Sequence, residues 1–174
     1  MGDGANSVVG GLGNDRLRTG IGNDVVIGNE GNDCIYAHDG ADTMTGGSGN
    51  DTFFFTSVGE DNNASAGGLI DTITDLDWTD DDVHLNGVTP NFARNYGAAF
   101  ASQGTLASAA SAAASTAFVD GGASAGTRDA AQFTYGGRTY LLVEAASFGS
   151  FVDIDDLLVD ITGATGTIST THLV

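Results

Sequence analysis

The first 54 residues of this 174-residue chain are six nine-residue repeats that follow one another without insertion. Glycine occupies the fourth place of every repeat, and an aspartate or asparagine occupies the sixth. The glycines are Gly4, Gly13, Gly22, Gly31, Gly40 and Gly49, and the sixth-place residues are Asn6, Asp15, Asp24, Asp33, Asp42 and Asp51. Scattered surface charge has no reason to keep a nine-residue spacing, so the period predicts one repeated structural unit.

Each repeat has the pattern of a tight turn followed by a very short strand. Its first six places hold mainly glycine and short polar residues, which suit a turn, and only places seven to nine favour extended backbone. The eighth place is always apolar, and its residues are Val8, Leu17, Val26, Ile35, Met44 and Phe53. Because side chains alternate along a strand, we expect the eighth place to point inward and the seventh and ninth to point outward. The fold class predicted is therefore mainly β.

A flattened coil with successive turns on opposite sides uses two repeats for each winding, so residues eighteen apart stack at the strand spacing of about 4.8 Å. Two ladders result, one of Asn6, Asp24 and Asp42 and the other of Asp15, Asp33 and Asp51. Calcium takes oxygen ligands at roughly 2.3 to 2.6 Å, so two carboxylates across one ion lie about 4.6 to 5.2 Å apart. The agreement of these spacings predicts a calcium-binding parallel β-roll, a β-solenoid of three windings.

The nonapeptide consensus GGxGxDxUx resembles the calcium-binding repeat of RTX proteins. The resemblance implies that each ion lies between two stacked turns. One turn gives the carbonyls of places two and four and its sixth-place carboxylate, and the next gives the carbonyls of places one and three and its own carboxylate. The implied sites are Gly11, Gly13 and Asp15 with Gly28, Glu30 and Asp33; Asn29, Gly31 and Asp33 with Gly46, Ser48 and Asp51; Gly20, Gly22 and Asp24 with Ala37, Asp39 and Asp42; and Gly2, Gly4 and Asn6 with Thr19, Ile21 and Asp24. The last site is the weakest, because Asn6 supplies no charge.

The charge balance favours cations as partners. The formal net charge is −18 at pH 7, the sequence pI is about 4.1, and the chain contains no lysine. Such a chain is unsuited to nucleic acid, and it would bind an anionic membrane only through bridging calcium. The single Cys34 cannot form an internal disulfide, so we expect bound calcium, rather than a covalent cross-link, to stabilise the fold. We expect no membrane insertion, because no apolar run reaches the length of a membrane-spanning helix, and no Sec-type signal core is present at the N-terminus.

Residues 55–174 lack the nine-residue period and are predicted to form a smaller α+β capping region. The strand at 52–55, the polar stretch at 57–68 and the segment LIDTITDLDWTDDDVHL resemble the part of RTX proteases that closes the roll. The apolar residues expected to cover the open end are Ile70, Ile73, Leu76 and Trp78. The acidic residues of the segment are Asp71, Asp75, Asp77, Asp80, Asp81 and Asp82. They would either complete a last ion or form an ordinary acidic loop.

Three later segments have predictable secondary structure. The stretch LASAASAAASTAF at 106–118 has the composition of a helix with good alanine propensity, or of a flexible linker. Two alternating strands in AQFTYGGRTYLLVEA meet at Gly136 and Gly137, which is typical of a β-hairpin, and one more strand is predicted at 157–161. This ending resembles the C-terminal tails of RTX proteins exported by type I secretion, whose uncleaved signal lies in that part of the chain.

Sequence motifs for catalysis are nearly absent, and we expect no enzymatic activity. A P-loop requires a lysine, no HExxH zinc helix is present, and His38, His84 and His172 lie far apart in the sequence. Residues 122–126 spell GxSxG around Ser124, but a nucleophile elbow needs a strand before the serine and a helix after it. The low-complexity alanine, serine and glycine around Ser124 favour coincidence.

These observations favour a calcium-binding structural module of a secreted protein, found outside the cell or at its surface, with the roll at 1–54 and the capping and secretion region at 55–174. Six inward side chains bury too little apolar surface to order 54 residues. We therefore expect the roll to stay unfolded in the low-calcium cytosol, to leave through the type I secretion apparatus, and to fold outside when calcium binds.

Two other functions remain open from the sequence. The roll begins at residue 1 without an N-terminal cap, so its unpaired strand edges would suit a self-assembling surface-layer or filament subunit. Self-association or contact with surface polysaccharide would then be its partner interactions. The chain would otherwise be the non-catalytic tail of a secreted hydrolase or epimerase, whose active site lies upstream.

Overall fold

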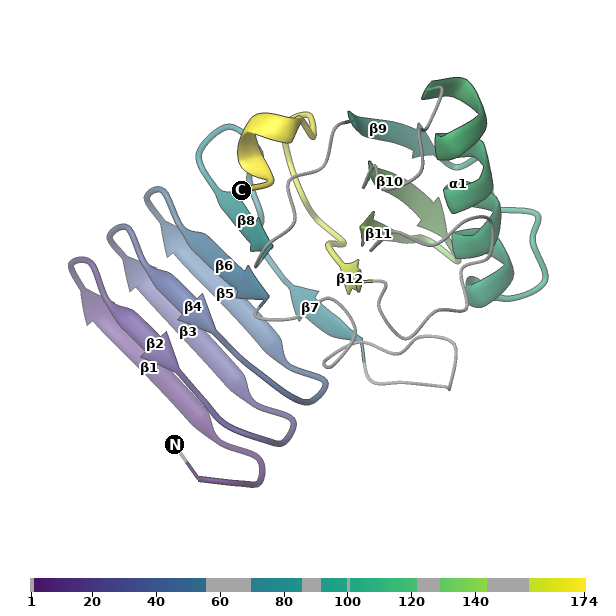
Figure 1. Ribbon diagram of the computed structural model, residues 1–174. Helices are drawn as coiled ribbons and strands as arrows, with labels where there is room; N and C mark the ends of the chain where they lie inside the picture. The colour runs from purple at the N-terminus through teal and green to yellow at the C-terminus, as the bar shows by residue number, and fades with distance from the viewer. Residues whose placement is uncertain (1, 56–69, 86–91, 100, 122–128, 144–156) are drawn as a thin grey trace.

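The computed structural model describes residues 2–55, 70–85, 92–99, 101–121, 129–143 and 157–174, and its first part is a flattened coil of parallel strands (Figure 1). β1 (Ser7–Leu12), β3 (Val25–Glu30) and β5 (Thr43–Ser48) lie on one side, and β2 (Arg16–Arg18), β4 (Cys34–Tyr36) and β6 (Thr52–Phe55) lie on the other. Neighbouring strands pair in parallel with residues eighteen apart opposite each other, as Val8 opposes Val26 and Leu17 opposes Ile35. These two sheets form the β-roll that the period predicts.

The strands on the two sides of the roll differ in length. β2 and β4 span three residues, in agreement with strands confined to places seven to nine. β1, β3 and β5 span six residues each and continue into the first three places of the following repeat. The prediction of three-residue strands is wrong on this side, because those first places also pair with the next winding, as Asn29 does with Gly47.

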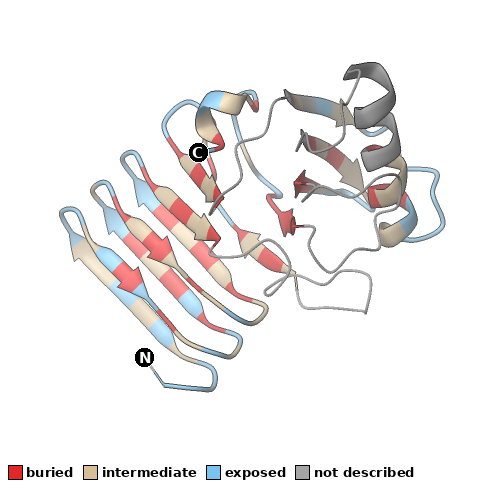
Figure 2. Ribbon diagram, viewed as in Figure 1, coloured by how far each residue is buried: buried red, intermediate tan, exposed pale blue. Residues whose placement is uncertain are grey.

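The eighth-place side chains form the apolar core of the roll. Val26, Ile35, Met44 and Phe53 are fully buried, and the side chain of Val8 at the start of the roll is half-buried against the same cluster. Figure 2 shows buried residues alternating with more exposed ones along the strands. The inward direction predicted for the eighth place is confirmed. Burial of each such side chain stabilises the folded roll by about 1.5–3 kcal/mol.

Both sheets of the roll continue into the rest of the chain. Among the described residues, the larger sheet has eight strands in the order β1, β3, β5, β7, β12, β11, β10 and β9. Its further strands are β7 (Asp71–Ile73), β9 (Phe92–Gly97), β10 (Asp129–Tyr135), β11 (Arg138–Val143) and β12 (Leu157–Asp160). The smaller sheet adds β8 (Asp82–Leu85) beside β6. The roll and the following region therefore share one continuous sheet.

The segment after the roll closes its end, largely as predicted. Ile73, Leu76 and Trp78 are buried in the same apolar cluster as Met44. Ile70 was expected to join them, but its side chain packs against a second apolar cluster. The reason is the alternation of the strand: Ile70 lies an odd number of residues before Ile73 and so faces the opposite side of the sheet. The polar stretch predicted at 57–68 lies outside the described residues.

The second apolar cluster lies between the larger sheet and α1 (Leu106–Gly121). Its buried members are Ala109, Ala110, Ala113, Ala131, Phe133, Tyr140, Leu142 and Leu158. The helix begins after Thr105, whose hydroxyl accepts a hydrogen bond from the Ser108 amide at 3.1 Å, as an N-cap residue does. Alanine side chains let the helix backbone approach the sheet closely. The helix prediction is therefore confirmed, and the alternative of a flexible linker is wrong.

The predicted hairpin is present as β10 and β11, which pair antiparallel. Gly136 and Gly137 have φ of 59° and 82°, the positive values that a tight two-residue hairpin turn requires. The strand predicted at 157–161 forms β12, which ends one residue earlier. Strand β9 was missed, because its sequence FARNYG shows no regular apolar alternation.

The last residues of the chain return to the roll, next to β8 (Figure 1). After a short 3-10 turn, η2 (Thr170–His172), Leu173 forms a parallel bridge with Val83 and is fully buried in the core of the roll. In the part of the chain that the structure describes, no helix has both the length and the apolar character needed to cross a membrane.

Candidate metal centre

The sixth-place residues form the two predicted ladders. In each ladder a carboxylate Oδ1 accepts a hydrogen bond from the backbone amide of the sixth-place residue one winding below. The bonds join Asn6 to Asp24 at 2.7 Å, Asp15 to Asp33 at 2.7 Å, Asp24 to Asp42 at 2.7 Å and Asp33 to Asp51 at 2.8 Å. The stacking with an eighteen-residue period is therefore confirmed, and it holds each carboxylate against its neighbours along an edge of the roll.

The second oxygen of three of these carboxylates is buried without a hydrogen-bond partner. Asp33, Asp42 and Asp51 are each 1% exposed, and the Oδ2 atom of each has no partner among the described residues. A buried carboxylate oxygen that is left unpaired is costly, because it loses its hydration and gains nothing in return. A bound cation is the ordinary way to satisfy such atoms, so the residues present fit a metal ion.

At two turns of the roll, a sixth-place carboxylate and a backbone carbonyl approach the same point. A Cβ atom built on Gly10 would lie 2.6 Å from Asp15 Oδ2 and 2.8 Å from the carbonyl oxygen of Gly28, one winding further on. The same convergence recurs at Gly28 with Asp33 Oδ2 and the carbonyl oxygen of Gly46, at closer approach. The carboxylate of one turn and the first-place carbonyl of the next therefore converge, which is the combination implied for the sites of Asp15 and Asp33.

Glycine at the fourth place is required by the backbone. All six fourth-place glycines have positive φ, between 93° and 150°. At Gly31, a Cβ atom would also run into the backbone of Gly13 in the winding below. The backbone conformation therefore disfavours a side chain at all six positions. Close stacking adds to this at Gly22, Gly31, Gly40 and Gly49, but not at Gly4 and Gly13.

The third-place carbonyls implied as ligands also hold the windings together. Each accepts a hydrogen bond from the fourth-place amide of the winding below. The pairs are Gly4 to Ile21 at 2.7 Å, Gly13 to Glu30 at 2.7 Å, Gly22 to Asp39 at 2.8 Å and Gly31 to Ser48 at 2.8 Å. The first-place carbonyl of Ala37 likewise accepts from the Thr19 hydroxyl at 2.6 Å. A carbonyl oxygen has a second lone pair, so these bonds leave room for a cation.

The turn that contains Asn6 differs from the other turns. The Asn6 side-chain amide donates to the carbonyl oxygens of Gly2 at 3.1 Å and Gly4 at 2.5 Å, and to Asp24 Oδ1 at 3.2 Å. This neutral donor does part of what a cation would do. The amide thus engages the two carbonyl oxygens that the resemblance implies as calcium ligands at this site.

The ladders give their carboxylates unequal proton affinities. Burial, together with the negative charges of Asp24 and Asp39, raises the pKa of Asp42 to about 6. Burial and the charges of Asp81, Asp33 and Asp75 likewise raise the pKa of Asp51 to about 6.

Asp24 shows the opposite shift. Burial alone would raise the pKa of Asp24, but hydrogen bonds from Asn6, Thr19 and Gly20 lower it below its usual value. Asp42 and Asp51, whose pKa values are raised, each keep an Oδ2 atom without a hydrogen-bond partner among the described residues, so calcium and protons compete for these carboxylates.

Fifth-place asparagines form further hydrogen-bonded stacks beside the two carboxylate ladders, and the sequence analysis did not predict them. Asn14 Oδ1 accepts from the Asn32 amide at 2.9 Å, and Asn32 Oδ1 accepts from the Asn50 amide at 3.0 Å. On the other edge, Asn23 Oδ1 accepts from the Ala41 amide at 3.1 Å. The signal was available, because four of the six repeats carry asparagine at this place.

Both carboxylate ladders extend one step beyond the repeats. Asp71 Oδ1 accepts from the Asp42 amide at 2.8 Å, and Asp81 Oδ1 accepts from the Asp51 amide at 3.0 Å. The sequence placed both aspartates in an acidic segment but did not single them out, because the spacing changes from eighteen residues to twenty-nine and thirty. The residues just before Asp71, at 56–69, lie outside the described residues.

Within the described parts of the chain, side chains alone do not make a metal site. Among the residues that the structure describes, no three His, Cys, Asp or Glu side chains converge as a group that would hold a metal ion. Ions along the ladders must therefore take most of their ligands from backbone carbonyls. An all-oxygen set of two carboxylates and several carbonyls suits calcium, which prefers six to eight oxygen ligands.

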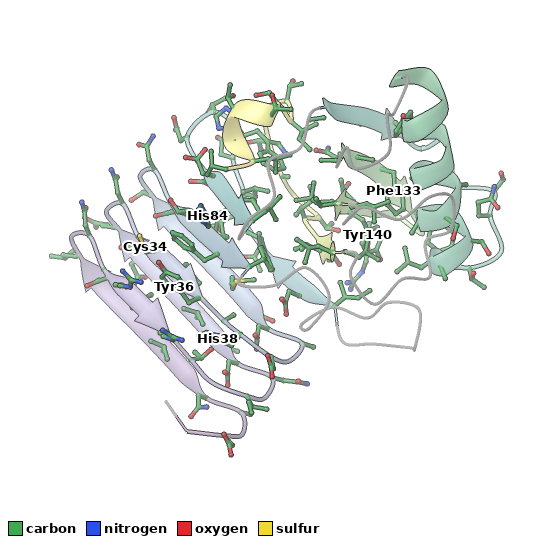
Figure 3. All side chains as sticks on the ribbon, in the orientation of Figure 1. Cys34, Tyr36, His38, His84, Phe133 and Tyr140 are labelled. Atoms are coloured by element: carbon green, nitrogen blue, oxygen red, sulfur yellow. The ribbon has the colours of Figure 1, made fainter. Side chains whose placement is uncertain are left out.

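The outward face of the smaller sheet carries a row of stacked rings (Figure 3). The ring centroids of Tyr36 and Phe54 lie 4.2 Å apart, and those of Phe54 and His84 lie 4.7 Å apart. The Arg16 guanidinium lies 4.6 Å from the centroid of the Tyr36 ring. Because the rings cover one another, the row reinforces strand stacking. Cys34 lies on β4, two residues before Tyr36, and His38 lies in the turn that follows β4 (Figure 3). Ser124 lies outside the described residues.

Comparisons with known proteins agree with this geometry. The family model for the RTX calcium-binding nonapeptide repeat (4 copies) matches residues 2–33 and 18–53. Among solved structures, the AlgE6R3 subunit of the Azotobacter vinelandii mannuronan C5-epimerase matches with a TM-score of 0.60 and 24% sequence identity, over 100% of this chain and 80% of that one. No curated protein matches. The first third of the chain thus carries RTX calcium-binding repeats in a β-roll, and the chain as a whole shares the fold of that subunit.

Proposed function

We propose that the chain is a non-catalytic, calcium-binding structural module of an extracellular protein, exported by type I secretion and folded by calcium outside the cell. The observation that carries the proposal is the set of buried Oδ2 atoms of Asp33, Asp42 and Asp51, on both edges of the roll, which have no hydrogen-bond partner among the described residues. These atoms recur in register with the repeat, and at Asp33 the Oδ2 atom and the carbonyl oxygen of Gly46 both approach the Cβ position of Gly28. They support a role in which the carboxylates bind cations rather than act on a substrate.

The same carboxylates would make folding conditional. Without a cation, buried like charges stacked at the strand spacing repel one another, and each has lost its hydration. Bound calcium would supply positive charge and fill the oxygen coordination between turns. Extracellular calcium modules bind in the range of about 10⁻⁴–10⁻³ M, so a chain of this kind would remain open in a low-calcium cytosol and fold after export.

A second candidate is that this module belongs to a larger secreted enzyme. It is supported by the fold shared with the AlgE6R3 subunit of a mannuronan C5-epimerase over the whole of this chain. In that case the module would hold or orient a separate catalytic region. The likeness at 24% identity concerns the fold, so the substrate of such an enzyme is not carried over to this chain.

Self-assembly is a further candidate, supported by the edge of the roll. β1 pairs on one side only in the described structure, and on this strand Val9 is 58% exposed and Leu12 is 81% exposed. An exposed strand edge with apolar side chains is a template for another chain.

One experiment separates the calcium-folded module, alone or within a larger enzyme, from the self-assembling subunit. Size-exclusion chromatography with light scattering, with far-UV circular dichroism on the same samples, is run in chelator and in millimolar calcium. Calcium-induced compaction of a monomer with a gain of β signal supports the proposed module, whether alone or as part of a larger enzyme. Growth in mass with calcium supports assembly. An unchanged profile and spectrum would show that calcium does not organise this chain.

A further inference from the structure

We infer that the two edges of the roll differ in their use of calcium. On one edge the turns bind the ion, and on the other edge two donors of the chain itself, the Asn6 amide and the Thr19 hydroxyl, replace it. We call them the glycine edge and the threonine edge, after the first residues of their turns, which are Gly10, Gly28 and Gly46 on one and Met1, Thr19 and Ala37 on the other. The inference rests on the proposed function, because it states which turns of the calcium-binding roll take an ion.

On the glycine edge, two oxygens from stacked turns approach one point that only a glycine leaves open. A Cβ atom on Gly10 would lie 2.6 Å from Asp15 Oδ2 and 2.8 Å from the carbonyl oxygen of Gly28. Further along this edge, the Oδ2 atoms of Asp33 and Asp51 are buried without a hydrogen-bond partner among the described residues. Oxygens left in this state are ligands for a cation.

Thr19 fills the equivalent point on the threonine edge. It has the same place in its repeat as Gly10, so its Cβ is directed between the Asp24 carboxylate and the carbonyl oxygen of Ala37. Thr19 is 3% exposed, and its hydroxyl donates to that carbonyl oxygen at 2.6 Å. A hydrogen bond between Thr19 and Asp24 also helps to hold the pKa of this carboxyl below its usual value. The side chain therefore occupies the space between two oxygens that the family resemblance assigns to one ion.

Asn6 has the same effect one winding earlier on this edge. Its side-chain amide donates to the carbonyl oxygens of Gly2 at 3.1 Å and Gly4 at 2.5 Å, and to Asp24 Oδ1 at 3.2 Å. The resemblance implies these three residues as ligands of one ion. A cation placed among them would meet the positive ends of N–H bonds where the other turns supply a carboxylate. The amide therefore replaces the ion instead of binding it.

Asp24, which belongs to both of these implied sites, has a partner at each of its oxygens. Oδ1 accepts from the Asn6 backbone amide at 2.7 Å, and Oδ2 accepts from the Gly20 amide at 3.4 Å, in addition to the side-chain contacts of Asn6 and Thr19. Asp33 on the glycine edge has the same place in its repeat and the same exposed fraction of 1%, but its Oδ2 has no partner among the described residues. A buried carboxylate with hydrogen bonds at both oxygens is satisfied by the protein and needs no cation.

The inference covers the two implied sites that join the three windings on the threonine edge, and it stops there. Ala37 offers no hydroxyl to Asp42, whose Oδ2 atom is buried without a partner among the described residues. Within the repeats, ions therefore join the windings on one edge, and hydrogen bonds join the same windings on the other. Asn6 and Thr19 determine which turns of the roll take calcium.

The first test replaces Thr19 in two ways. Thr19→Gly reproduces the glycine edge, whereas Thr19→Val keeps the volume of the side chain and removes only its hydroxyl. Bound calcium is counted by native mass spectrometry and by equilibrium dialysis with atomic absorption, on chains whose calcium-induced folding is checked by circular dichroism. We expect Thr19→Gly to bind one ion more than the wild type, and Thr19→Val to bind no more than the wild type. A Thr19→Gly chain that folds in calcium and gains no ion would show that the inference is wrong.

A second comparison does not depend on that gain. Asp24→Asn and Asp33→Asn each remove one charge from a buried sixth-place residue, and asparagine keeps an oxygen that can accept a hydrogen bond from the winding below. We expect Asp24→Asn to bind as many ions as the wild type, and Asp33→Asn to bind at least one fewer. An ion lost from Asp24→Asn would overturn the inference, even if Thr19→Gly does not fold. A wild-type chain that binds no calcium would overturn the proposed function as well.

Discussion

The roll and the region after it share one sheet but stabilise it in different ways. Along β1, β3 and β5, the inner face of the sheet packs on a single layer of eighth-place side chains, and the turns carry stacked carboxylates. Around β12 the sheet is covered on both faces, by the core of the roll and by the second cluster beneath α1, and all four residues of the strand are buried. Apolar burial dominates the second region, whereas buried charge dominates the first.

This difference shows that one continuous sheet can contain a permanent part, which is folded with or without calcium, and a conditional part, which folds only when calcium is bound. The contribution of an apolar cluster to folding stability does not depend on the calcium concentration. Buried carboxylates such as Asp33 and Asp51 contribute to stability only when a cation compensates their charge, and otherwise they oppose folding. The strands after the roll should therefore act as a folded base on which calcium assembles the windings.

The largest expected effect comes from Asp33→Asn. Asp33 takes part in two implied sites, with Asp15 and with Asp51, and it is 1% exposed. The loss of a charged ligand at each site should cost about 1.5–3 kcal/mol, or about 3–6 kcal/mol together. Because several ions bind as the roll folds, this cost is shared among them, and the calcium concentration at half-folding, followed by circular dichroism, should rise about three- to tenfold. The matched control is Asp3→Asn, which removes the same charge from an exposed side chain that no implied site uses. Equal shifts in the two variants would contradict a role for the ladder.

The comparison of the two regions is sharpened by one truncation in each core. Met44→Ala in the roll and Leu142→Ala in the second cluster both remove a fully or almost fully buried side chain, and each should cost about 2–5 kcal/mol. Met44→Ala should act mainly by raising the calcium concentration needed for folding, because roll folding and binding are linked. Leu142→Ala should lower the melting temperature in chelator and in calcium alike. If both variants behaved in the same way, the two regions would be a single folding unit.

A smaller effect is expected from Gly31→Ala. Gly31 has φ of 128°, and a Cβ atom there would meet the backbone of Gly13. The strain should destabilise the calcium-loaded roll by about 1–3 kcal/mol, measured by thermal unfolding. Gly104→Ala provides the control, because nothing lies within 4 Å of its Cβ position. We expect that control to stay within about 0.5 kcal/mol of the wild type. Two indistinguishable melting curves would argue against the close stacking of the turns.

The smallest effect is on pH dependence. The pKa values of Asp42 and Asp51 are raised to about 6, so both carboxylates bind a proton more readily in the metal-free folded roll than in the unfolded chain. The metal-free fold should therefore gain stability as pH falls through 6 towards 4. Calcium must displace those protons, so its apparent affinity should fall by about tenfold per carboxylate between pH 7 and pH 5. Calcium titrations at both pH values measure this, and an affinity that does not change would argue against buried ligands.

The sequence predicted what depends on a local, repeated pattern. The three windings, the inward eighth place and the ladders follow from the nine-residue period, and the hairpin follows from Gly136 and Gly137. What it missed depends on contacts between distant segments. Asp71 and Asp81 continue the ladders at irregular spacings, and β9 carries no apolar alternation.

The positions of two further residues depend on tertiary packing, which the local sequence pattern does not reveal. Leu173 enters the core of the roll from the far end of the chain, which no local signal indicates. Ile70 packs against the second cluster because strand alternation directs it away from Ile73, and the prediction did not apply that alternation to it. The carbonyl ligands implied by the family resemblance stay a prediction, since each ligand set must be tested with bound calcium.

The most direct test of a conditional roll on a permanent base is hydrogen exchange followed by mass spectrometry, in chelator and in millimolar calcium. In calcium, amides of residues 7–55 and of 129–143 should both exchange slowly. In chelator, residues 7–55 should exchange within the shortest labelling time, while β10, β11 and α1 keep their protection. Slow exchange of residues 7–55 in chelator would contradict the account, because it would show that the buried carboxylates need no cation.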